Sequence, residues 1–170
     1  MYTNSQVQQV KHDIENWTRE FVEASNEFYG GNFPVCPYAR HARIKGQTTC
    51  QIYKRGSVKH FIEESVEKLL DDDTTKQMLI VLPPITKWYP GMDKFIYTLN
   101  KRIIPLNYFA MRGSANGCRN SFPGFINRGE YQLIGLNTLD KVLEGVEYLK
   151  KQGYYNCLLY TSPSPRDTNP

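Results

Sequence analysis

The sequence predicts an α/β layered fold, in which helices pack on a sheet of about four strands. Two observations lead to this prediction. Apolar residues recur at helical spacing in several long segments, and the stripe that contains Val58, Phe61 and Leu69 is the cleanest of them. Short apolar runs lie between these segments, and the run 78–82 is typical of a central strand covered on both faces. Strands that alternate with helices favour helices layered on a sheet.

An amphipathic helix is expected at the N-terminus, over residues 6–28. Its spaced apolar and aromatic positions are Ile14, Trp17, Phe21 and Phe28. Two glycines and an asparagine at 30–32 end this helix, since glycine and asparagine are the usual residues after a helix C-terminus.

A short helix, a strand and a longer helix follow. The short helix is expected over 37–44, because Pro37 suits a first helical position. Residues 48–54 are expected to form a strand. Ser57 then caps the helix that carries the apolar stripe, and the aspartates at 71–73 end that helix in solvent.

The second half of the chain repeats this alternation. A helix is expected from Met92 to about Ile103, followed by strands over 107–111 and 131–136. The last helix is capped by Asn137 or Thr138. Its buried face is expected to comprise Leu139, Val142, Leu143, Val146 and Leu149.

Length and composition are those of one globular domain. The chain has 170 residues, 40% hydrophobic residues and a net charge of +4. This charge permits an anionic ligand but is well below that of a dedicated nucleic-acid binder, so a nucleic-acid partner is not expected. No run is long and apolar enough for a membrane span, and the polar N-terminus is unlike a signal peptide. A cytoplasmic location and reduced thiols are therefore expected.

Residues 157–167 differ sharply from the segment before them. All eleven residues resemble the translation of a transposase adapter used in DNA sequencing, and the alternative is a natural Ser/Pro linker. On the first interpretation, residues 1–156 form a single domain that is truncated at its C-terminus, and residues 157–170 are a non-native tail.

Cys36 is the first candidate site residue. It stands beside Pro37, where a helix start would expose free backbone N–H groups and the positive end of the helix dipole to a thiolate. A dithiol oxidoreductase is excluded within this motif, because Ala39 stands where the second cysteine would be. A single-thiol nucleophile near Arg40 and Arg43 remains one interpretation. The other is a thiol that only packs in a tight loop-to-helix junction.

The second candidate is the irregular segment 112–128. A long stretch without periodicity in a compact domain is usually functional or mobile. Arg112 and Arg119 lie among small residues there and suit contact with a phosphate or carboxylate, while Cys118 can serve as a second thiol. A flexible surface loop is the alternative.

Metal and cofactor motifs are lacking. The three histidines are far apart and no CxxC or HxxxH pair occurs, so no metal site is predicted. The glycines match neither a P-loop nor a dinucleotide fingerprint, so no cofactor is predicted.

The order of motifs resembles a family of uncharacterised bacterial proteins, a domain of unknown function with a Cys-Pro-Phe-Ala motif. The matching features here are Trp17, Asn32 and Cys36-Pro37-Tyr38-Ala39, and the likeness covers most of residues 10–150. It implies the position of a site and no particular chemistry.

Two functions remain open at this stage. One is a protein with a single-thiol or anion-binding pocket around Cys36, for a small anionic ligand held by Arg40, Arg43, Arg112 and Arg119. The other is a non-enzymatic interaction module, of cellular or viral origin, in which Cys36 is structural.

Overall fold

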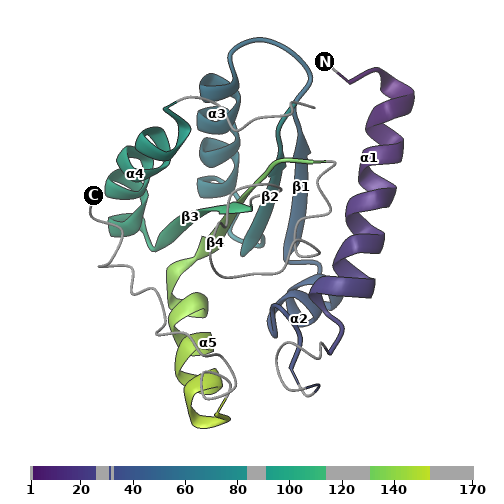
Figure 1. Ribbon diagram of the computed structural model, residues 1–170. Coiled ribbons are helices and arrows are strands. Elements are labelled where there is room, and N and C mark those ends of the chain that lie inside the picture. The colour runs from purple at the N-terminus through teal and green to yellow at the C-terminus, as the bar shows by residue number, and fades with distance from the viewer. Residues whose placement is uncertain (1, 26–30, 32, 84–90, 114–130, 154–170) are drawn as a thin grey trace.

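The computed structural model describes residues 2–25, 31, 33–83, 91–113 and 131–153. A four-stranded mixed sheet lies at its centre, in the order β1-β2-β4-β3 (Figure 1). The strands are β1 Thr48–Ile52, β2 Gln77–Val81, β3 Tyr108–Gly113 and β4 Leu133–Thr138. β1 and β2 are parallel, and β4 runs antiparallel to both β2 and β3. The predicted α+β layered fold with four strands is thus confirmed.

Helices cover both faces of the sheet. On one face, α3 (Val58–Leu70) and α4 (Met92–Ile103) pack their apolar stripes against β2, β3 and β4 (Figure 1). This larger core includes Ile62, Leu69, Ile80, Leu99, Ile134 and Leu136. On the other face, α1 (Asn4–Trp17) packs with residues of β1, β2 and β4 into a second, smaller core.

The N-terminal helix is shorter at its C-terminal end than predicted. Thr3 caps α1, and the helix continues from Thr18 to Val22 as a π-helical turn, η1. The helix was expected to continue to residue 28, but it ends at Val22. Ser25 already pairs with Pro34 in an isolated antiparallel bridge. The chain therefore turns back directly after η1. Phe28 lies outside the described residues.

All four strands form close to their predicted positions along the chain, but their first and last residues differ from the prediction. β1 ends at Ile52, although Tyr53 N still donates to Val81 O at 2.9 Å. β3 extends to Gly113, so Arg112 belongs to a strand and not to a loop. A 3-10 turn, Ile104–Leu106, connects α4 to β3.

The last helix, α5 (Leu139–Lys151), differs from the prediction in its cap and its buried face. Thr138 occupies the N-cap position without a side-chain capping bond, and Asn107 Oδ1 accepts from Asp140 N at 3.1 Å instead. Leu143, predicted to be buried, is 51% exposed. Leu149 is buried as predicted, and Gly145 is buried as well. The buried face of α5 differs from the prediction because the helix packs against the Cys36 turn through Gly145.

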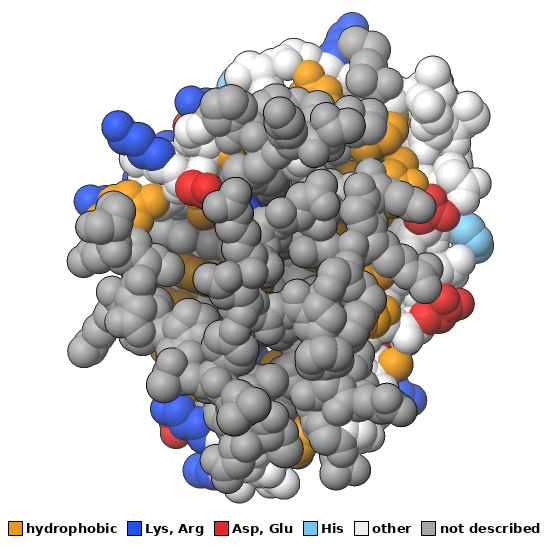
Figure 2. Space-filling view, viewed as in Figure 1, with side chains coloured by type: hydrophobic (Ala, Val, Ile, Leu, Met, Phe, Trp, Pro, Cys, Tyr) orange, Lys and Arg blue, Asp and Glu red, His pale blue; other side chains and the backbone are white. Residues whose placement is uncertain are grey.

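On the face shown in Figure 2, the described Lys and Arg side chains lie scattered around the rim, with Asp and Glu between them. Over the described residues, no helix is both long and apolar enough to cross a membrane.

Candidate functional site

The turn around Cys36 joins three segments of the chain. Cys36 N donates to Val22 O at 3.0 Å, which ties the turn to the end of η1. The helix that follows, α2, spans Ala39–Ile44. It begins two residues later than predicted and ends at the predicted residue. Pro37 and Tyr38 form a turn, with Ala39 N donating to Cys36 O at 3.3 Å. The expected position of Pro37 in the first helical turn is therefore wrong.

The environment of Cys36 favours a neutral thiol. Burial raises the pKa of this thiol, and hydrogen bonding from the backbone at Tyr38 and Ala39 lowers it by less. The negative charge of Glu23 raises the pKa further. Backbone N–H groups do lie near the thiol, as expected from the sequence, but the cost of removing a thiolate from water is larger. The predicted stabilisation of a thiolate is not found.

Arg43, predicted as an anion contact, is bound by the protein itself. Its Nε and Nη2 each donate to a Glu23 carboxylate oxygen at 2.7 Å, a bidentate pair between α2 and the residue after η1. The Glu23 side chain is only 5% exposed. Hydrogen bonding from Arg43 lowers the pKa of Glu23, so the carboxylate is charged and the pair is complete.

The remaining predicted arginines do not gather at Cys36. Arg40 is exposed on α2, and its charge acts on Glu23. Arg112 lies on β3, the opposite edge strand from β1, and its Nη1 donates to Asp93 Oδ1 at 2.9 Å. Cys36 precedes α2, which leads into the start of β1, whereas Arg112 is near the end of β3, and β3 runs in the same direction as β1. The structure therefore does not bring Arg112 and Cys36 together, and Arg112 binds Asp93 instead. Arg119 and Cys118 lie outside the described residues.

Tyr38, the aromatic residue of the Cys36 motif, packs against α5. Its ring lies over Gly145, so close that a Cβ at that position would overlap Cε2 of the ring and lie 3.0 Å from Cδ2. Glycine is the one residue that leaves room for this ring on the helix surface. The Cys36 turn therefore holds η1, α2 and α5 together, which is a structural role.

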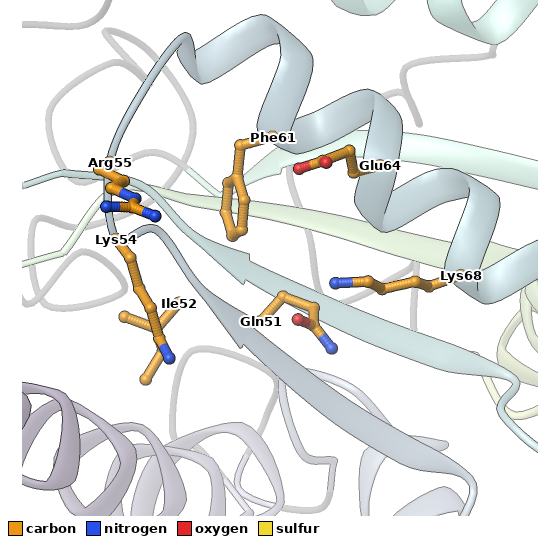
Figure 3. A pocket seen from close by; sticks show the side chains of 7 residues that line it. All are labelled: Gln51, Ile52, Lys54, Arg55, Phe61, Glu64 and Lys68. Atoms are coloured by element: carbon orange, nitrogen blue, oxygen red, sulfur yellow. The ribbon is translucent and has the colours of Figure 1, made fainter.

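A second site, not predicted from the sequence, lies between β1 and α3. A hollow of about 320 Å³ opens between β1 and α3. Its lining residues are Gln51, Ile52, Lys54, Arg55, Phe61, Glu64 and Lys68. We call this hollow the β1–α3 groove. Figure 3 shows Lys68 extending from α3 toward the strand and Lys54 lying along the strand's edge.

Positive charge predominates in the β1–α3 groove. Lys54, Arg55 and Lys68 face it together with a single carboxylate, Glu64. Glu64 also lies 3.5 Å from His60 Nε2 on the exposed side of α3. Among the described residues, none of the three cations forms an ion pair or a side-chain hydrogen bond. The sequence signal was the Lys54-Arg55 pair after a strand, which becomes a site only when α3 adds Lys68.

Comparison with protein-family models, curated proteins and solved structures finds no match to this chain. The resemblance carried by Cys36-Pro37-Tyr38-Ala39 therefore stays a prediction.

The described residues also include no group of three or more His, Cys, Asp or Glu side chains placed to hold a metal ion. The two sites thus offer different chemistry. The Cys36 turn has a buried thiol with a raised pKa and a completed ion pair. In the described part of the chain, the β1–α3 groove has cations without a partner, beside a strand with no further strand at its edge.

Proposed function

We propose that this protein is a non-enzymatic interaction module that binds an acidic partner protein in the β1–α3 groove, with Cys36 as a packing residue. The observation that carries the proposal is the set of three cations, Lys54, Arg55 and Lys68, that line the groove. Glu64 is the one carboxylate among the described residues that line it, and none of the three cations forms an ion pair there. Unpaired cations around a hollow attract carboxylates and give a binding surface its specificity and association rate.

The Cys36 turn supports the same proposal by contrast. A nucleophilic cysteine is expected in an electropositive, partly exposed place that lowers its pKa. Here burial raises the pKa of Cys36, and Arg43, one of the two predicted arginines of α2, already binds Glu23. The turn also holds Tyr38 against Gly145. These contacts favour the role of Cys36 in packing over the single-thiol pocket.

The test measures binding of octaglutamate, a flexible carboxylate probe, by isothermal titration calorimetry at low salt. The variant K54E/K68E reverses two charges of the groove and should weaken binding by about tenfold or more. The matched control K94E/K151E makes the same change in net charge on α4 and α5 and should leave binding within about twofold. The variant C36A should bind like the parent.

Equal loss in K54E/K68E and K94E/K151E would mean that octaglutamate senses only net charge, and the proposal would be wrong. If C36A folds, keeps the groove intact and loses binding, the single-thiol pocket would be favoured over the interaction module. Circular dichroism and urea unfolding of each variant establish that the comparison is made on folded protein.

A further inference from the structure

The outer side of β1 carries backbone groups that the sheet does not use. Gln47 O accepts from Gln77 N at 3.0 Å, and Tyr53 N donates to Val81 O at 2.9 Å. Residues of a parallel strand alternate between bonding to one side and to the other. Thr48, Cys50 and Ile52 therefore direct their N–H and C=O groups away from β2. In the described part of the chain, no strand lies beyond β1 to receive them.

The opposite edge of the sheet is treated differently. At the centre of β3, Asn100 of α4 takes the place of a neighbouring strand. Its Nδ2 donates to Ala110 O at 2.9 Å, and Ala110 N donates to its Oδ1 at 2.8 Å. Proteins commonly cover an edge strand in this way, because free edges pair with other chains. The edge of β1 has no such covering side chain among the described residues.

Lys54, one of the cations of the β1–α3 groove, lies along this edge (Figure 3), and Lys68 reaches toward the strand from α3. Lys68 is seven residues beyond Phe61 on α3, or about 10 Å along the helix axis. Phe61 packs edge-on against Tyr53 at the end of β1, near Lys54 and Arg55. Lys68 therefore lies at one end of the groove, and Lys54 with Arg55 at the other. The distance of about 10 Å between the two ends corresponds to about three residues of a strand, at about 3.3 Å per residue. An extended chain with spaced carboxylates matches both places.

We infer that the outer edge of β1 binds an extended acidic segment of the partner as a fifth strand of the sheet. Its backbone bonds to Thr48, Cys50 and Ile52, and its carboxylates contact Lys68 at one end and Lys54 with Arg55 at the other. Main-chain hydrogen bonds give such strand addition its affinity, and the flanking side chains give its specificity. This inference rests on the proposed function, because it assigns a conformation to the acidic partner proposed for the same groove.

The test uses an acetylated peptide of four Glu-Thr repeats, chosen because threonine favours strands and glutamate supplies the charge. A second peptide has the same sequence with N-methyl groups on the four threonines, and a third has them on the four glutamates. One of the two methylated peptides loses the donors that face β1 and should bind about tenfold more weakly or worse, since each lost hydrogen bond is worth a severalfold change. The other methylated peptide should bind more nearly like the parent peptide.

The second readout is amide hydrogen exchange on the intact protein, followed by NMR. The parent peptide should slow exchange at Cys50 and Ile52 by about tenfold at saturation, while Ala110 on the opposite edge stays unchanged. Lys-dependent binding with equal affinities for all three peptides and unchanged exchange at Cys50 would overturn strand addition and leave the proposed function standing. Equal binding of the parent peptide to K54E/K68E and to the unmodified protein would overturn both strand addition and the proposed function.

Discussion

The ring of Tyr38 occupies the space in which a side chain at Gly145 would lie. An added Cβ would overlap Cε2 of the ring and stand 3.1 Å from Cζ. The contact joins two segments more than one hundred residues apart in the sequence. It explains how the Cys36 motif contributes to the fold without any chemistry at its thiol.

The variant G145A should destabilise the protein. In a helix interior, replacing glycine with alanine normally stabilises by about 1 kcal/mol. Here the methyl group meets a rigid ring, and overpacking of this kind costs about 1 to 3 kcal/mol. Urea unfolding should therefore show a net loss of stability.

The double variant Y38A/G145A provides the control. With the ring removed, the same glycine-to-alanine change should become stabilising, so the effect of G145A changes sign between the two backgrounds. Stabilisation by G145A in the parent protein would show instead that Tyr38 leaves the helix at no cost.

The pair formed by Glu23 and Arg43 should make stability depend on pH. Hydrogen bonding from Arg43 lowers the pKa of Glu23 in the folded state. The stabilisation is therefore complete above the unfolded-state pKa, about 4.3, and is lost as the pH falls through the lower folded-state pKa. At neutral pH, E23Q should cost about 1 to 2 kcal/mol, because it weakens a charged, partly buried hydrogen-bonded pair.

The difference between E23Q and the parent should shrink as unfolding is measured at progressively more acidic pH. E20Q removes an exposed carboxylate from the same segment and is the matched control, with an expected change within about 0.5 kcal/mol. A cost of E23Q that stays constant down to the acid transition would contradict the pairing.

Cys36 should react slowly with iodoacetamide. Burial raises its pKa, so less thiolate is present at neutral pH than in a free cysteine, whose pKa is about 8.5. The alkylation rate, followed by peptide mapping, should keep rising with pH beyond that value. Cys50 is an internal comparison, since burial raises its pKa to about 11. A rate for Cys36 that levels off below the free-cysteine pKa would restore the activated nucleophile.

Asn100 should stabilise the β3 edge. N100A removes the side chain that bonds both backbone groups of Ala110 and should cost about 2 kcal/mol, at about 1 kcal/mol for each hydrogen bond. The Ala110 amide should also exchange faster. K94A on the exposed side of the same helix should change stability by less than about 0.5 kcal/mol. Equal effects of the two variants would mean that water replaces Asn100 at this edge.

Much of the fold was predictable from local patterns. The α3 helix spans its expected residues, and Ser57 caps it, with His60 N donating to Ser57 Oγ. The apolar run at 78–82 contains most of β2. Such features depend on residues three or four apart in a helix, or two apart in a strand, so the sequence displays them directly.

The errors occur where distant contacts compete with local ones. The N-terminal stripe continues beyond Val22, but the pairing of Ser25 with Pro34 turns the chain back. Leu143 has a helical spacing that favours burial, yet Gly145 is the residue that packs, because the ring of Tyr38 lies there.

The candidate sites were less predictable than the fold. Cys36 was identified from its neighbours, but its pKa depends on burial and on Glu23, thirteen residues earlier. The β1–α3 groove combines the end of a strand with one face of the following helix. Its residues are scattered in the sequence and match no motif.

By itself, the sequence determined the alternation of helices and strands, the Ser57 cap of α3 and most of the apolar stripes, and hence the layered fold. Only the tertiary structure decided that Arg43 pairs with Glu23, that burial raises the pKa of Cys36, and that Lys54 and Lys68 line one groove. The physical reason is the distance along the sequence over which each interaction acts. Periodicity and capping act between near neighbours, whereas desolvation and charge pairing depend on which distant segments the fold brings into contact.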